Sequence, residues 1–546
     1  MRIRERLSEH LSEGINKYRL VCMLAFMALI TLLAWQSDDA YHAYVMAKHL
    51  VEGHGFVYNI GERASASSCP LFTLVIALGY LVFRNMFMVS LLICIVFSSL
   101  AAHIVFYDFC DNRKRLFCTF IVLAGSCSFV SYTTSGLENS LLFFLAALFY
   151  RYYYTHEAYN GKQLWFMGFL VSLIAMTRMD AVLMFVPAIL FVYLAERERV
   201  SFFKAVLTGI LSLLPFIMWE LFSLFYYGFP FPNTAYVKLG TGIALSEYIY
   251  RGLQYVFIST LCDLPLMAMI AFMIAAAIIA RRARVTWAAL GVFVYILYVI
   301  YIGGDFMLGR HFTVAFLISV MTCLHIMQKC IDVDFKRRRA ENALIITIFA
   351  SVFFSVSSGL ITDQFLFGHE NSLPIADERA GYFRYTSLYN NIISLIRTGE
   401  LCIRQAWNEQ GIDELRARGL DSGLVEMAPG ISVYYNSDMY LSDWYGLMDP
   451  FLSKLPGVKE DNWRVGHIWR DPPYGYEETL AYKTDQIENP SLQEYYNVIR
   501  FVTRGKLFDK DRIRAIIDLN LGRYDHLLED YKRTLDETGR QVRTGD

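Results

Sequence analysis

A long series of apolar segments constrains the fold of this chain more than any other feature. A transmembrane helix needs about 20 apolar residues, and about 17 is the lower limit. The segments that approach or exceed this length are 20–36, 68–83, 86–107, 116–133, 137–155, 164–178, 181–195, 203–227, 253–280, 285–302, 311–331 and 342–361. With 546 residues, of which 55% are hydrophobic and 18% charged, the chain is too apolar for a soluble protein and too long for one membrane anchor. These features predict a polytopic α-helical membrane protein.

The density of charged residues changes near Leu360. Charged residues are sparse before this point and frequent after it. The shift predicts a membrane domain over residues 1–361 and a C-terminal domain over 362–546. Within the latter, Leu424 to Tyr435 alternates like short strands and residues 511–534 have helical spacing. We therefore expect a mixed α/β fold after the membrane domain.

Basic residues predict the topology. The N-terminal arginines favour a cytoplasmic N-terminus, because cytoplasmic loops carry an excess of Lys and Arg. The further basic loops that should share this face are 113–115, 197–204, 281–284 and 336–339. All four loops face the cytoplasm only if segment 68–83 does not cross the membrane. This segment is short and is followed by Arg84, so we expect it to be an interfacial or re-entrant helix. We expect about eleven transmembrane helices and a C-terminal domain outside the cytoplasm.

This topology brings the polar clusters at the helix ends to one outer face. Polar and ionisable residues at membrane depth are costly and by default mark a substrate path. The first outer loop, 37–67, opens with Ser37-Asp38-Asp39, and its residues 41–51 predict an amphipathic helix on the membrane surface. The candidate site residues on this face are Asp38, Asp39, Tyr41, Arg63, Glu138, Arg178, Asp180, Asn233, Lys238, Asp305, Arg310 and His311.

Several of these residues also have an ordinary structural interpretation. The acids of the Asp38-Asp39 pair would be solvated at a helix end, and Arg178 and Asp180 would pair with each other. Glu138 would interact favourably with the dipole at the start of a helix. Asn233 would cap a segment, and Arg63 would be a single exposed arginine.

The chemistry of this face suits glycosyl transfer from a lipid-linked phosphosugar. A carboxylate can act as a general base towards a sugar hydroxyl. Arginine and lysine can hold a phosphate and stabilise the charge that builds on it as it leaves. Nucleotide-sugar donors are made in the cytoplasm, so an outward-facing site would need a lipid donor.

Other functions fit the sequence less well. The net charge of −1 and the lack of a Lys/Arg-rich tract argue against nucleic-acid binding. Transporters tend to show internal repeats, and none is found here. No Cys/His spacing indicates zinc. The clustered acids could hold Ca²⁺ or Mg²⁺ through oxygen ligands, but no spacing requires a metal, and no cofactor is predicted with certainty.

Several motifs, spread along nearly the whole chain, resemble the membrane arabinofuranosyltransferases, which are GT-C-type enzymes. The motifs are DDAYHAYVMAKHLVEGHGFVYNIGER at 38–63, TSGLEN at 134–139, TRMDAV at 177–182, YYGFPFPNTAYVKLG at 226–240, GGDFMLGRHF at 303–312, GLMDPFLSKLP at 446–456, GHIWRDPPYGYEETL at 466–480 and IENPSLQEYYNVIRFVTRGKLF at 487–508. The likeness extends to the mycobacterial and corynebacterial terminal β-(1→2)-arabinofuranosyltransferase and to related pilin arabinosyltransferases.

The resemblance implies a polyprenyl-phosphoryl arabinofuranose donor, an arabinan, other glycan or pilin acceptor, and a multi-pass protein of the bacterial cytoplasmic membrane with an extracytoplasmic catalytic face. It implies an aspartate at the start of the first outer loop as the catalytic acid or base, which is Asp39 or Asp38 here. The sequence departs from the family pattern at two places, and the second affects the acceptor contacts that the resemblance implies. Met179 stands where relatives usually have Pro, and ASASSCP follows Arg63 where relatives often have an aromatic residue.

The resemblance also implies net retention at the anomeric carbon, by two displacements or by front-face attack. The alternative among enzymes is a hexosyl- or other pentosyltransferase that uses polyprenyl phosphate to modify a pilin or surface polysaccharide. The alternative from another class of protein is a lipid-sugar transporter.

Overall fold

The computed structural model describes residues 2–197, 200–238, 241–330, 342, 375–405, 410–425, 429–458 and 463–537. Three predicted features lie outside the described residues: the basic loop 336–339, the apolar segment 342–361 after its first residue, and the domain boundary at 361/362.

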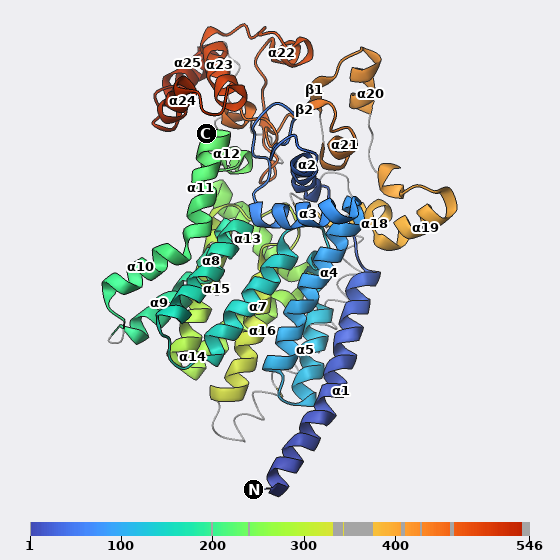
Figure 1. Cartoon of the computed structure of the whole chain (residues 1–546), viewed down its shortest axis with the longest axis vertical. Helices are drawn as coiled ribbons and strands as arrows, with labels where there is room; N and C mark the ends of the chain where they lie inside the picture. The colour runs from blue at the N-terminus through green and yellow to red at the C-terminus, as the bar shows by residue number, and fades with distance from the viewer. Residues whose placement is uncertain are drawn as a thin grey trace.

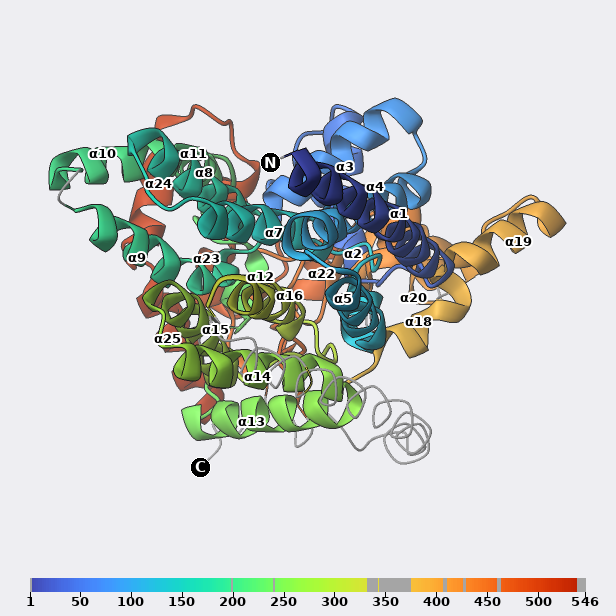
Figure 2. The ribbon, with the colours of Figure 1, turned by 90° about the horizontal axis from the view of Figure 1, so that it is seen from below.

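The N-terminal part is a bundle of helices (Figure 1). Their bounds are α1 (Arg2–Leu32), α2 (Ala40–Val51), α3 (Pro70–Phe83), α4 (Met86–Ile104), η1 (Val105–Phe109), α5 (Arg113–Gly125), α6 (Cys127–Tyr132), α7 (Asn139–Thr155), α8 (Gly161–Thr177), η2 (Met179–Met184), α9 (Val186–Glu196), α10 (Phe202–Ser212), α11 (Leu214–Tyr227), α12 (Asn233–Lys238), α13 (Leu245–Cys262), α14 (Leu264–Ala280), α15 (Ala283–Tyr301), α16 (Phe312–His325) and η3 (Ile326–Cys330). Seen from below, α7 lies near the centre, with α4 and α8 on opposite sides (Figure 2).

Five stretches of the described chain are long and apolar enough to cross a membrane, and the number rises to seven if each of two bent helix pairs is one span. The predicted total of about eleven is not confirmed. The bent pairs are α10 with α11, at 53°, and α13 with α14, at 110°. In each pair a proline lies in the first turn of the second helix. Proline has no N–H to donate and disfavours helical geometry in the residue before it, which explains both breaks.

Helix α3 has 14 residues and lies across the end of the bundle rather than along it (Figure 1). Its Pro70 occupies the first turn and Arg84 ends it in the left-handed conformation, with φ +53°. This placement fits a short interfacial helix better than a full span.

The C-terminal part lies over this end of the bundle (Figure 1). Its elements are α18 (Glu378–Thr386), α19 (Leu388–Thr398), η4 (Cys402–Gln405), α20 (Gln410–Ala417), β1 (Ser422–Val425), α21 (Pro429–Tyr435), β2 (Tyr440–Asp443), η5 (Leu452–Lys454), β3 (Gly457–Val458), β4 (Trp469–Arg470), α22 (Tyr476–Tyr482), α23 (Pro490–Arg504), α24 (Lys510–Asn520) and α25 (Asp525–Glu537).

The strands form two separate two-stranded sheets. β1 pairs with β2 in parallel, with Ser422 opposite Tyr440, and β3 pairs with β4 in antiparallel fashion. Within the described residues, the C-terminal part is mainly helical and has these two small sheets, so the expected mixed α/β fold is not confirmed. The helical expectation for residues 511–534 agrees with α24 and α25.

The expectation of strands up to Tyr435 is wrong after residue 428. Residues 429–435 form α21, which begins at Pro429, a residue whose fixed φ suits a first helical position. The N–H groups of Gly430 and Ile431 donate to the carboxylate of Asp38, 392 and 393 positions earlier in the chain. A helix cap supplied from so far away leaves no local signal.

Helix α2 forms where the sequence predicts a helix, but most of its side chains are buried, so it is not an exposed amphipathic helix. Its Tyr41 packs against Tyr44 and against Tyr434 of α21, with ring centroids 4.8 and 5.4 Å apart. Lys48 on the same helix donates to Ser437 at 2.8 Å. The first outer loop is thus enclosed between α3 and the C-terminal part.

Candidate functional site

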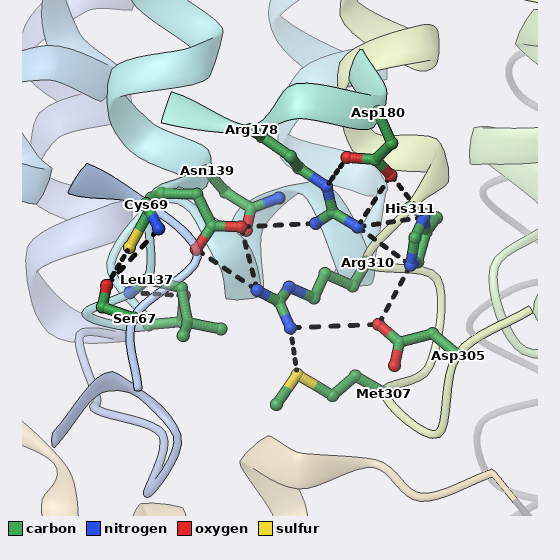
Figure 3. A network of polar contacts seen from close by, with 12 residues as sticks. Ser67, Cys69, Leu137, Asn139, Arg178, Asp180, Asp305, Met307, Arg310 and His311 are labelled. Carbon is green, nitrogen blue, oxygen red and sulfur yellow. Dashed lines mark hydrogen bonds and ion pairs between the residues drawn. The ribbon is translucent and has the colours of Figure 1, made fainter. Parts of the chain in front are cut away.

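Six of the predicted site residues meet at the end of the bundle that faces the C-terminal part. Figure 3 labels Arg178, Asp180, Asp305, Arg310 and His311. The six residues come from three short connections between helices. Glu138 immediately precedes α7, Arg178 and Asp180 lie at the junction of α8 and η2, and Asp305, Arg310 and His311 lie between α15 and α16.

Glycines allow the third connection to turn sharply. Gly303 and Gly304 follow α15 with φ values of +85° and +80°. A Cβ at Gly304 would lie 2.5 Å from Cβ of Tyr255, so both the conformation and the close packing require glycine. The Tyr255 hydroxyl donates to Met307 O at 3.0 Å and accepts from His311 N at 3.3 Å, which fixes the loop.

Glu138 joins two guanidinium groups. Its carboxylate accepts from Arg310 Nη2 at 2.9 and 3.2 Å and from Arg178 Nη1 at 3.3 Å. Arg178 Nε also donates to Asp180 at 2.9 Å, and Arg310 Nη1 lies 3.9 Å from Asp305. The ion pair of Arg178 with Asp180 is therefore one arm of a wider network.

His311 connects the remaining members of this ion-pair cluster. Its Nε2 lies 3.4 Å from Asp305 Oδ2, and the Tyr295 hydroxyl of α15 lies 3.0 Å from its Nδ1. Arg178 Nη2 lies 2.9 Å from His311 Nε2. The carboxylates of Glu138 and Asp305 retain only 5% of their side-chain exposure. Buried charges are tolerated only when paired, and here carboxylates hold both arginines in place.

The two acids of the first outer loop differ in their surroundings. Asp38 is buried, and its carboxylate accepts two backbone N–H groups from α21, at 3.1 and 2.8 Å. Asp39 keeps some exposure, and its side chain makes no capping bond to α2. Asp38 therefore joins the first outer loop to the C-terminal part, whereas Asp39 remains partly exposed.

The structure adds Glu378 and His467 to the surroundings of Asp39. Glu378 begins α18 and lies 3.4 Å from the Ser37 hydroxyl. Burial, together with the charges of Asp39 and Asp38, raises the pKa of the Glu378 carboxyl well above its ordinary value. Burial lowers the pKa of His467, although the charge of Asp39 opposes this effect.

Asp39 therefore lies near two groups, Glu378 and His467, whose pKa shifts both favour the uncharged form. Sequence reasoning missed both residues, because an acid and a histidine in a polar region are unremarkable. His467 lies in the GHIWRDPP stretch, which was the one signal available for it.

Lys238, at the end of α12, is exposed, whereas the predicted arginines of the site are only partly exposed. Its charge acts on His311, and its Cε would lie 3.5 Å from a Cβ built at Gly466. Among the residues that the structure describes, Lys238 makes no ion pair or hydrogen bond. Unlike Arg178 and Arg310, it has no carboxylate partner there, so its ammonium group remains available for an anionic ligand.

The other predicted residues lie outside the ion-pair cluster. Arg63 donates to Gly505 O and lies 3.5 Å from Val502 O, at the end of α23, so it holds the first outer loop to the C-terminal part. Asn233 is buried at the start of α12, and its backbone N–H donates to Ser65 O. The Tyr41 hydroxyl donates to Gln36 at 2.5 Å.

No group of three or more His, Cys, Asp and Glu side chains within the described ranges is arranged to hold a metal ion.

Comparison with known proteins gives a match over one segment. The family model of dolichyl-phosphate-mannose-protein mannosyltransferase matches residues 67–219. No curated protein matches the chain. Among solved structures, ArnT from Cupriavidus metallidurans bound to undecaprenyl phosphate is 11% identical, with a TM-score of 0.47 over 80% of this chain and 77% of that chain. Residues 67–219, which carry Glu138, Arg178 and Asp180, are thus similar to a family of glycosyltransferases.

Proposed function

We propose that this protein is a GT-C-type membrane glycosyltransferase that takes an arabinofuranosyl residue from a polyprenyl-phosphate donor. The acceptor is a glycan or glycoprotein on the outer face of the cytoplasmic membrane, and the product is a terminal β-(1→2) linkage. The match of residues 67–219 to a mannosyltransferase family supports the glycosyl-transfer chemistry. The motifs of the first outer loop and of residues 226–240 and 303–312 support the arabinofuranose donor.

One observation carries the proposal: an accessible carboxylate, Asp39, lies near a rigid network of buried ion pairs, with the exposed ammonium of Lys238 at the same end of the bundle. A lipid-linked phosphosugar needs these two kinds of group. The carboxylate acts at the sugar, and the cation neutralises the phosphate that leaves. The ion-pair cluster connects the chain next to the starts of α7 and α16 with the junction of α8 and η2 at this end of the bundle.

In the reaction, the bond between the anomeric carbon and the phosphate oxygen breaks, and the electron pair stays on the polyprenyl phosphate. Lys238 stabilises the new negative charge. The acceptor hydroxyl forms the glycosidic bond and its proton passes to Asp39. If retention proceeds through two displacements, Asp39 first attacks the anomeric carbon and releases polyprenyl phosphate. The acceptor hydroxyl then displaces Asp39 as a carboxylate and gives its proton to the released phosphate.

The raised pKa of Glu378 favours this role of Asp39. A second ionised carboxylate beside Asp39 would make the site more anionic and would repel the donor phosphate. A neutral Glu378 avoids this repulsion and can donate a hydrogen bond to a sugar oxygen.

The family match is to a mannosyltransferase, and this observation favours a hexosyl donor as the second candidate. Membranes that contain the protein, incubated in parallel with labelled polyprenyl-phosphoryl arabinose and polyprenyl-phosphoryl mannose, separate the two. Transfer of arabinose alone supports the proposal. Transfer of mannose alone replaces arabinose by a hexose, and transfer of neither sugar contradicts both candidates.

A further inference from the structure

A chain of aromatic rings leads away from Asp305 into the C-terminal part. The first contact joins Phe306, the residue after Asp305, to His467, with ring centroids 4.2 Å apart. His467 contacts Tyr445 at 5.0 Å, and Tyr445 contacts Trp469 at 5.4 Å. Trp444 completes the series, 5.6 Å from Trp469.

The backbone around these rings is held rigidly. Asp443 accepts from the N–H groups of Leu447 and Met448, at 3.1 and 2.8 Å, and so closes the turn that carries Trp444 and Tyr445. Trp469 belongs to β4, where it pairs with Val458.

A second contact joins the two aromatic segments. The backbone N–H of Arg470 donates to Trp444 O at 2.8 Å. Rings held in this way lose little conformational entropy when a ligand binds.

The two outer rings are not core residues. Trp463, in the same part of the chain, is 3% exposed and packs against Tyr248. By contrast, Trp444 and Trp469 each keep part of their surface exposed. Two exposed polar residues, Arg464 and Asp471, flank residues 465–470, the stretch that carries Trp469.

At its inner end, the series reaches the reacting groups. Phe306 N donates to the carboxylate of Asp305 at 2.9 Å, and Ala376 N donates to Phe306 O at 2.7 Å, two residues before Glu378. The charge of Asp39 acts on His467. The rings therefore run from the surroundings of Asp39 to a partly exposed surface of the C-terminal part.

We propose that Trp444 and Trp469, backed by the buried ring of Tyr445, form the acceptor subsite, on which sugar rings of the acceptor glycan stack while its terminal hydroxyl reaches Asp39. A sugar ring presents an apolar face of C–H groups and a rim of hydroxyls. Partly exposed aromatic rings with polar neighbours match both, as is usual for small-molecule sites. This inference rests on the proposed function, and it adds where the acceptor lies.

The test uses the full-length protein in detergent, with octyl arabinofuranoside oligomers as the acceptor probe. Trp469→Ala and Trp444→Ala are compared with Tyr482→Ala, which removes an aromatic ring that is 60% exposed in α22. Three quantities are measured: transfer to the oligomers, slow hydrolysis of the labelled donor by water, and the change in tryptophan fluorescence on adding the oligomers without donor.

We expect each tryptophan variant to raise the acceptor KM by about tenfold, which is the loss of roughly one aromatic contact. Donor hydrolysis should stay at the wild-type level, and the fluorescence change should weaken. Tyr482→Ala should behave as wild type.

A wild-type acceptor KM in both tryptophan variants would overturn the subsite, as would an equal loss in Tyr482→Ala. If the wild-type protein transfers no sugar and hydrolyses no donor, the proposed function fails instead. Fluorescence titration then decides on the subsite alone: a change lost in Trp469→Ala supports an oligosaccharide site, and no change in the wild type overturns it.

Discussion

Removal of the Glu138 carboxylate should destabilise the membrane part strongly. Glu138 accepts from Arg310 and Arg178, and its loss leaves two buried guanidinium groups with fewer partners. Removing one partner of a buried ion pair costs about 3–5 kcal/mol. Because Arg178 keeps Asp180 at 2.9 Å and Arg310 keeps Asp305 at 3.9 Å, we expect Glu138→Ala to cost about 3 kcal/mol, the low end of that range.

Glu138→Gln keeps the size of the side chain and one acceptor oxygen, so it should lower the free energy of unfolding by about half as much as Glu138→Ala. The assay is denaturant unfolding of the purified protein in mixed micelles, followed by tryptophan fluorescence. Arg151→Ala is the matched control, since its ion pair with Asp108 at 2.9 Å is exposed and should contribute less than about 1 kcal/mol. A loss in Glu138→Ala no larger than in Arg151→Ala would refute the reasoning.

Three further substitutions test groups of the candidate site. Wild-type transfer should fall as pH rises through the raised pKa of Glu378, because ionisation adds a second negative charge. Glu378→Gln should abolish this fall at high pH, and an unchanged profile would contradict the assignment. Gly430→Ala places Cβ 2.2 Å from Asp38 O, whereas a Cβ at Gly411 meets nothing within 4 Å. Gly430→Ala should therefore lower activity and thermal stability, and the control Gly411→Ala should lower neither. Lys238→Gln should raise the donor KM by about tenfold, with partial rescue by Arg; an unchanged donor KM would remove Lys238 from the phosphate site.

The ion-pair cluster could be predicted because its residues lie at the ends of apolar segments. Apolar segments locate helix ends from local sequence alone, and basic loops then place those ends on one side or the other. This reasoning brings Glu138, Arg178 and Arg310 together without any knowledge of packing. It cannot say that carboxylates already hold both arginines, because this depends on distances between three separate connections.

Long-range contacts explain what the sequence could not predict. Helix α21 depends on a carboxylate from Asp38, so its local pattern resembles strands. Arg63 carries the positive charge expected of a phosphate ligand, but its guanidinium group instead contacts backbone carbonyls at the end of α23. Glu378 gains its raised pKa only after folding places it near Asp39. In each case the deciding partner lies hundreds of residues away.

Transfer by Asp39→Asn tests the central claim most directly. The side chain keeps its size and loses its charge, and Asp39 makes no capping bond, so folding should be unaffected. With labelled polyprenyl-phosphoryl arabinose as donor, the account predicts loss of transfer by at least about 100-fold, while chromatographic behaviour and thermal stability match the wild type. Asp39→Asn protein that retains full transfer activity would contradict the account.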